Sequence, residues 1–176
     1  KVKIFPPSCI DNGETYFSTV SKDDPGRGYV GIYAPGAQSS ATSAIHILAS
    51  HYEGKRFADY GGNDTLKDAY WTNVCYYNSI RELAQAVNWV DADIYEHSKI
   101  ILHRDNDPSH SSNGIPRPLY MELNSRNQDV SVGESFELLS HQLKDDKPNT
   151  RGSTMDFCFA TNMISVGIDI DRLGLM

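Results

Sequence analysis

Apolar and polar positions along the chain predict short strands that alternate with amphipathic helices. Runs rich in β-branched and aromatic residues are typical of strands, and they occur at 29–34, 71–77, 118–123 and 155–160. Apolar residues recur at helical spacing between these runs, at 39–52, 80–90 and 131–143. Because strands that alternate with helices form parallel units with right-handed crossovers, we expect an α/β fold with a mainly parallel sheet flanked by helices in three layers.

Two of the predicted helices begin with a capping box, in which a Ser caps the helix and a Glu three residues later bonds back to the cap. The pairs are Ser79 with Glu82 and Ser131 with Glu134. The second of these helices is expected to turn its apolar side chains inward, namely Val132, Phe136, Leu139 and Leu143.

The remaining segments carry weaker signals. Residues 1–28 hold several turn signals made of Pro, Gly, Asn and Asp, so we expect a lead-in or linker there and one folded domain over 29–176. The segment 53–70 is polar with several glycines, which predicts a connection, and 99–102 predicts a short strand. The stretch 105–118 is rich in Asp, Ser, Asn and Pro and predicts a surface loop.

Composition restricts the classes of function that remain. The length of 176 residues suits about one domain. No window approaches the roughly 18 apolar residues of a membrane span, so no membrane partner is expected. The formal net charge of −7 argues against a basic, non-specific nucleic-acid binder. It does not exclude a module that grips a few phosphates with backbone N–H groups and one or two Arg side chains.

Cysteine and histidine positions indicate no metal site. Cys75 and Cys158 fall within predicted strands, where a free Cys behaves as a small apolar residue. There is no CxxC pair and no paired Cys/His spacing, and the six His residues form no HxxxH or HExxH pattern. We therefore expect no bound metal, a reducing environment and a cytoplasmic location.

Three predicted strands end in small polar residues, at Asn78-Ser79, Ser125-Arg126 and Thr161-Asn162. In a parallel sheet these ends lie at one edge, which is where open α/β sheets bind their ligands. Hydroxyl groups and helix N-terminal N–H groups can bind phosphates there, and such contacts position a nucleic-acid backbone without reading its bases. The simpler interpretation is that each Ser or Thr is an ordinary helix N-cap, and both interpretations remain open.

These segments resemble motifs of the second RecA-like domain, also called the helicase C-terminal domain, of superfamily 2 helicases. ATNMISVGIDIDRLGLM at 160–176 resembles motif V, WTNVCYYNSIRELA at 71–84 resembles motif IV, and LYMELNSR at 119–126 resembles the segment between them. The sequence of the motif V segment, together with GRGYVGIYAPG at 26–36, most resembles the large helicase of DISARM phage-defence systems and its helicase-related relatives. The resemblance covers roughly residues 25–176, and motif V is its most specific part.

The resemblance implies a RecA-like domain that grips nucleic acid, with DNA favoured over RNA, and that completes an ATP cleft with the first RecA-like domain of the same parent chain. It implies contacts to the nucleic-acid backbone from Ser79, Ser125, Arg126 and Thr161, with charge-assisted bonds from the guanidinium group. It places two further residues at the ATP cleft, Gly167 and Asp169.

Each of these roles has a plain alternative. Asp169 could cap the next turn, Arg126 could pair with Glu122 or with a helix carboxylate, and Gly167 could only supply a positive φ. Asn124 stands where the family pattern often has Thr, which leaves a hydrogen-bonding side chain in place.

Several helicase motifs are missing from the sequence. There is no GxxxxGK[ST] loop and no Asp-Glu pair ending a strand that could hold Mg²⁺. The arginine-finger motif, Gly-Arg-x-Gly-Arg, is expected past Met176, so the domain is expected to be incomplete at its C-terminus. We expect no catalytic residue in this chain and no ATP hydrolysis by it alone, with ATP and Mg²⁺ bound only by the full-length protein.

The sequence therefore predicts a fragment of an ATP-dependent nucleic-acid helicase or translocase. One alternative is a non-catalytic α/β binding or scaffold module derived from a helicase-like domain. A third hypothesis is a nucleotide- or phosphate-binding domain that uses the loop at 34–40. This loop follows a predicted strand and opens a helix but lacks the glycine spacing of a dinucleotide-binding loop.

Overall fold

A computed structural model describes residues 23, 28–37, 39–104, 116–124, 132–143, 154–161 and 170–176. The chain divides into two compact units, Lys1–Pro35 and Gly36–Met176. All regular elements of the described residues lie in the second unit. In chain order they are α1 (Ser40–Phe57), α2 (Asp64–Ala69), β1 (Asn73–Tyr76), α3 (Ile80–Trp89), the π-helical turn η1 (Val90–Ile94), α4 (Tyr95–Arg104), β2 (Tyr120–Leu123), α5 (Val132–Ser140) and β3 (Phe157–Ala160).

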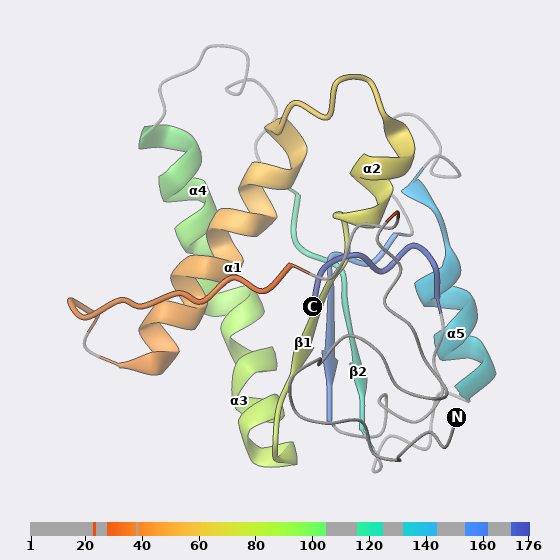
Figure 1. Ribbon diagram of the computed structural model, residues 1–176. Coiled ribbons are helices and arrows are strands. Elements are labelled where there is room, and N and C mark those ends of the chain that lie inside the picture. The colour runs from red at the N-terminus through yellow and green to blue at the C-terminus, as the bar shows by residue number, and fades with distance from the viewer. Residues whose placement is uncertain are drawn as a thin grey trace, which may run out of the picture. The chain divides into compact units, whose positions relative to one another are not determined.

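The three strands form one parallel sheet in the order β1-β3-β2. Figure 1 shows α1, α3 and α4 on one side of this sheet and α5 on the other. The fold is thus an α/β domain whose parallel sheet is flanked by helices, which confirms the class predicted from the alternating pattern. Parallel sheets need cover on both faces, and the helices supply it.

The last strand in the sequence, β3, is the central strand of the sheet. All four of its side chains are buried. Phe157 and Phe159 belong to the larger core cluster, while Cys158 and Ala160 belong to a smaller cluster on the opposite face. A strand covered on both faces reads as a continuous apolar run, and FCFA is such a run.

The two core clusters tie the helices to opposite faces of the sheet. The larger one joins β3 to α1, α3, η1 and α4, through Leu48, Ala49, Tyr52, Leu83, Ala86, Val90, Ile94 and Leu102. In the smaller one, Leu139 of α5 packs with Val74 of β1 and with the far face of β3. The free thiols of Cys75 and Cys158 pack as apolar groups, as expected, and burial raises the pKa of both to about 12.

The segment 170–176 lies along β1. Leu175 forms a parallel bridge with Asn73, and the Val74 N–H donates to the Leu175 carbonyl at 3.1 Å. The Gly174 N–H donates to the Ala69 carbonyl at 2.9 Å. A Cβ at Gly174 would lie 3.0 Å from that same carbonyl oxygen, so the close approach of the two backbones favours Gly at this position.

Two predicted strands are wrong. The segment 29–34 forms no strand, and its Tyr29, Val30 and Tyr33 side chains are exposed. An apolar β-rich run becomes a strand only where a neighbouring strand pairs with its backbone groups. The segment 99–102 lies within α4, because η1 carries the helical chain on from α3. The buried residues Ile94, Ser98 and Leu102 follow the four-residue spacing of a helix face.

Two smaller expectations also need correction. The predicted connection at 53–70 contains the end of α1 and all of α2. In α5, Phe136 was expected to face inward, but it is 42% exposed, whereas Ser135 and Leu139 are buried. Leu139 is thus buried as predicted, and Leu143 is half-buried, while the side chain of Val132 lies outside the described residues. Ser135 and Leu139 are four residues apart and share one face of the helix, from which Phe136 is turned away.

Candidate functional site

The carboxyl ends of the three strands lie side by side. Tyr76 of β1 pairs with Ala160 of β3, and Leu123 of β2 pairs with the same residue. Just beyond them, the Tyr77 N–H donates to the Ala160 carbonyl at 2.8 Å, and the Thr161 N–H donates to the Leu123 carbonyl at 3.1 Å. The prediction that these strand ends share one edge is confirmed, and we call this edge the carboxyl edge.

Ser79 caps α3 at the carboxyl edge. Its hydroxyl oxygen accepts the Glu82 N–H at 3.2 Å, and its O–H donates to the Glu82 carboxylate at 3.0 Å. The bond from the Glu82 N–H to the Ser79 hydroxyl is one half of the predicted capping box. In the other half the Glu82 carboxylate accepts from the Ser79 hydroxyl, where the standard motif uses the backbone N–H of the cap residue. A phosphate would have to take the hydroxyl proton from Glu82, so the side chain of Ser79 is committed to the helix. The first N–H groups of α3, which have no intrahelical acceptor, are the better donors at this point.

Thr161 and Asn124 follow the ends of β3 and β2. Thr161 is half-buried one residue past the central strand. The Asn124 amide donates to the Glu122 carboxylate at 3.2 Å, so its side chain bonds back to its own strand. A carboxylate at this edge repels phosphate, and a basic group beside it is needed before an anion can bind.

The other predicted site residues are Ser125, Arg126, Gly167 and Asp169. They lie outside the described residues, and their roles stay predictions. In the parts of the chain that are described, no group of three or more His, Cys, Asp and Glu side chains could hold a metal ion.

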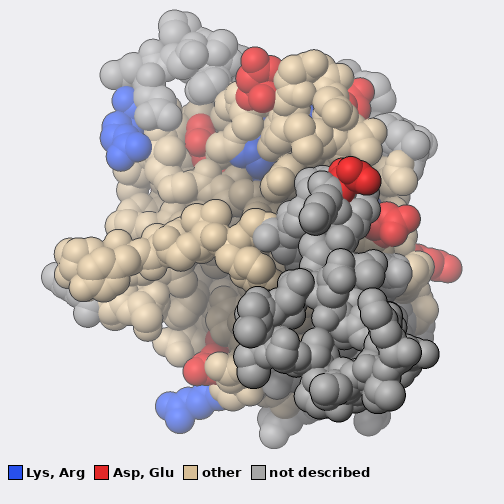
Figure 2. All heavy atoms as spheres, viewed as in Figure 1, with Lys and Arg blue, Asp and Glu red and all other residues tan. Residues whose placement is uncertain are grey.

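Charge on the described surface is mixed. In the face shown in Figure 2, the described Lys and Arg side chains form separate small groups, with Asp and Glu side chains between them. On this face the described residues form no continuous basic surface of the kind that non-specific nucleic-acid binders present. Phosphate contacts from the described residues of this face would come from a few discrete donors.

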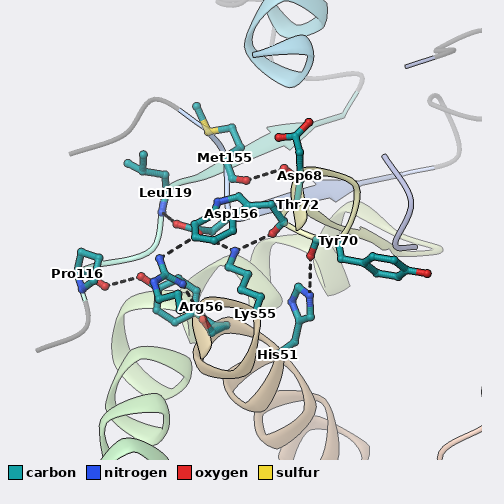
Figure 3. Close-up of polar contacts among 12 residues, drawn as sticks. His51, Lys55, Arg56, Asp68, Tyr70, Thr72, Pro116, Leu119, Met155 and Asp156 are labelled. Carbon is teal, nitrogen blue, oxygen red and sulfur yellow. Dashed lines mark hydrogen bonds and ion pairs between the residues drawn. The ribbon is translucent and has the colours of Figure 1, made fainter. Parts of the chain in front are cut away.

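A buried polar network lies at the opposite end of the sheet, before the first residues of the strands (Figure 3). Asp156, just ahead of β3, accepts the Lys55 ammonium at 2.6 Å, the Arg56 guanidinium at 3.3 Å and the Leu119 N–H at 2.8 Å. Lys55 also donates to the Trp71 carbonyl at 2.7 Å. The network joins the end of α1 to the entry of all three strands.

Burial sets the protonation of this network. The Lys55 side chain is 1% exposed, and desolvation lowers its pKa to about 8 against the pull of Asp156. His51, one turn earlier in α1, donates from Nε2 to the Tyr70 carbonyl at 3.2 Å, and its buried Nδ1 has no partner among the described residues. Burial and the nearby Lys55 charge lower the pKa of His51 to about 4.

Arg172 makes a second buried set of polar contacts. Its guanidinium forms a two-pronged pair with Asp68 of α2 at 3.0 and 3.1 Å, and it donates to the Leu139 carbonyl of α5 at 2.9 Å. The same group donates to the Thr72 hydroxyl at 3.1 Å. These contacts fasten the segment 170–176 to α2 and α5, so this Arg is a structural residue.

Sequence patterns did not reveal either polar network, because their members come from distant parts of the chain. The one local signal is a charged residue next to an apolar segment, namely Asp156 directly before FCFA. Charged residues are almost never fully buried unless they are paired, so this isolated Asp was the available signal.

No protein-family model matches the chain. It is similar to the DISARM protein DrmA of Bacillus paralicheniformis, with 32% identity over 181 residues. The match covers 98% of this chain and 15% of the relative. The chain is therefore similar to one part of a much longer protein. None of the described helices is both long and apolar enough to cross a membrane.

Proposed function

We propose that this chain is most of the second RecA-like domain of an ATP-dependent nucleic-acid helicase or translocase of the DISARM type. The observation that carries the proposal is the carboxyl edge. At this edge, the end of β1, whose sequence resembles motif IV, pairs in register with the end of β3, which leads into the sequence that resembles motif V. Leu123, at the end of β2, pairs with β3 from the other side. Similarity to DrmA along nearly the whole chain supports the same assignment.

In this proposal the carboxyl edge grips the nucleic-acid backbone. The Thr161 hydroxyl donates to one phosphate, and Ser125 and Arg126 bind a neighbouring one, where the Arg charge offsets Glu122. The N-terminal N–H groups of α3, beside Ser79, add an anion contact. Such contacts hold a strand without reading its sequence, which suits a motor that must move along any sequence.

ATP and Mg²⁺ belong to the complete protein in this proposal. When bound, ATP supplies the phosphoryl-transfer energy that opens and closes the two RecA-like domains. Gly167 and Asp169 would face that cleft from this side. Because both lie outside the described residues, and because the described ones include no group of three or more His, Cys, Asp and Glu side chains that could hold a metal ion, we derive no step of hydrolysis from this chain.

The test uses the complete protein with Thr161→Ala and Arg126→Ala, and with Thr65→Ala on the exposed face of α2 as the matched control. Removing a hydrogen bond to a charged group costs about 1.5–3 kcal/mol, so each of the first two variants should bind labelled single-stranded DNA roughly tenfold or more weakly. The rate of DNA-stimulated ATP hydrolysis should fall together with the DNA affinity, and the control should match wild type in both measurements. Unchanged affinity in both variants refutes the proposed grip.

One further function remains, namely a scaffold module without a nucleic-acid contact. Two observations favour it: the Ser79 hydroxyl is fully used in its capping box, and the Asn124 amide is turned to Glu122. A complete coding sequence without a GxxxxGK[ST] loop, together with wild-type DNA binding in the Thr161 and Arg126 variants, would decide for the scaffold.

A further inference from the structure

Two histidines from different helices lie in contact outside the sites described above. His46 of α1 and His97 of α4 have ring centroids 4.3 Å apart, with the ring planes at 77°. His46 is exposed and His97 is half-buried. They are far apart in the sequence, so no local spacing pattern could have paired them.

The helices that carry the pair are held firmly. Figure 1 shows α1 and α4 side by side on one side of the sheet, and buried Leu48 and Ala49 of α1 belong to the same core cluster as Ile94 and Leu102. Because this core packs both helices together, the backbones that carry the two imidazoles are held in place. Ligands that are held in place before binding lose little entropy when an ion arrives.

We propose that His46 and His97 bind one late first-row divalent transition ion, such as Zn²⁺ or Ni²⁺, as a two-histidine clip between α1 and α4. A neutral imidazole nitrogen binds Zn²⁺ at about 2.0–2.1 Å, so two nitrogens on one ion lie roughly 3–3.5 Å apart. The ring centroids are 4.3 Å apart, and rotation of both side chains about their Cα–Cβ and Cβ–Cγ bonds would bring one nitrogen of each ring to this separation. The exposed side of His46 leaves room for water to complete the coordination.

The ligand type sets which ion is bound. Imidazole favours Zn²⁺, Ni²⁺ and Cu²⁺, whereas Mg²⁺ prefers carboxylate, carbonyl and water oxygens. This site is therefore distinct in chemistry from the Mg²⁺ that accompanies ATP, and it does not depend on the proposed helicase function. The simpler explanation for the pair is an edge-to-face ring contact, and the experiment separates the two.

The experiment titrates Zn²⁺ and Ni²⁺ into the complete protein by isothermal calorimetry, comparing wild type with His46→Ala and His97→Ala. His103→Ala, an exposed position on the same helix α4, is the matched control. The clip requires that both test variants lose the same binding equivalent and that the control keeps it. Equal stoichiometry and affinity in all four proteins refutes the clip.

A second measurement needs no substitution. Paramagnetic Ni²⁺ broadens NMR signals of nearby groups, so substoichiometric Ni²⁺ should broaden the imidazole signals of His46 and His97 together while that of His103 stays sharp. Broadening at one of the two rings alone means ordinary single-histidine binding and overturns the proposal, as does broadening at neither.

Discussion

At the scale of single residues, Asp156 connects segments that are far apart in the chain. It is buried, and its carboxylate accepts from Lys55, Arg56 and the Leu119 N–H. Two of these donors come from α1, and the third precedes β2. Because the ion pair is almost fully shielded from water, breaking it should lower the free energy of unfolding more than breaking a surface pair.

Asp156→Asn should destabilise the domain strongly. The amide keeps the shape of the carboxylate but removes its charge, which leaves the Lys55 ammonium buried without a counter-charge. Breaking such a buried pair costs about 3–5 kcal/mol, measured as the loss in free energy of unfolding in urea. The control is Glu96→Gln, which breaks the exposed pair with Lys99 at 2.6 Å and should cost about 1 kcal/mol or less. Equal losses in the two variants would contradict the structural role of Asp156.

His51 should make the domain sensitive to acid. Its pKa is about 4 in the folded chain against an ordinary 6.5, so the unfolded chain binds the extra proton first as pH falls. The free energy of unfolding keeps the full contribution of His51 above pH 6.5. It falls as pH drops toward 4, by an amount on the order of 3 kcal/mol. His51→Gln can still donate to the Tyr70 carbonyl but cannot titrate. Its unfolding free energy should therefore change less between pH 7 and pH 4.5 than that of wild type, and identical pH slopes would rule out His51 as the cause.

At the scale of elements, α3 links a stability role to the candidate site. Its Ser79 cap satisfies the Glu82 N–H at the end of the helix that faces the carboxyl edge. A cap and a phosphate contact make different demands on Ser79. The cap needs only a side-chain acceptor, whereas a phosphate needs a donor and rejects negative charge.

Two substitutions at Ser79 separate these roles. Ser79→Ala should cost about 1 kcal/mol of stability because the cap is lost. Ser79→Asp keeps an acceptor for the Glu82 N–H, and the exposed Glu82 side chain can turn away from the new carboxylate, so its unfolding free energy should stay closer to that of wild type. If phosphate lies against this end of α3, the added charge of Ser79→Asp should weaken DNA binding by the complete protein. Wild-type DNA affinity in Ser79→Asp would remove α3 from the proposed grip and leave it a cap only.

At the scale of the whole molecule, the sequence predicted the features that depend on local pattern. The strands predicted at 71–77, 118–123 and 155–160 and the helices predicted at 39–52, 80–90 and 131–143 were found near their expected positions, because amphipathic spacing is a pattern of neighbouring residues. The cap at Ser79 was also predictable from such a pattern, whereas Ser131 lies outside the described residues. The run Ile100 to Leu102 was misread because three consecutive apolar residues fit a strand or a helix equally well.

Features that depend on distant residues could not be predicted in this way. The Lys55–Asp156 pair and the contact of His46 with His97 join segments that have no common local pattern. Strand order is likewise a property of the whole sheet. The shared carboxyl edge was predictable only because every strand was expected to be parallel, which forces their ends to one side.

The central place of β3 has a consequence for how the domain forms during synthesis. Within the described sheet, β1 and β2 each pair with β3 and not with each other, so neither can join a ladder of this sheet until Phe157–Ala160 has left the ribosome. Until then, the N–H and C=O groups of both waiting strands are open to other chains. Contacts between distant segments also slow the folding search. This sheet must therefore assemble late, and the nascent chain has a period in which chaperones can protect it from aggregation.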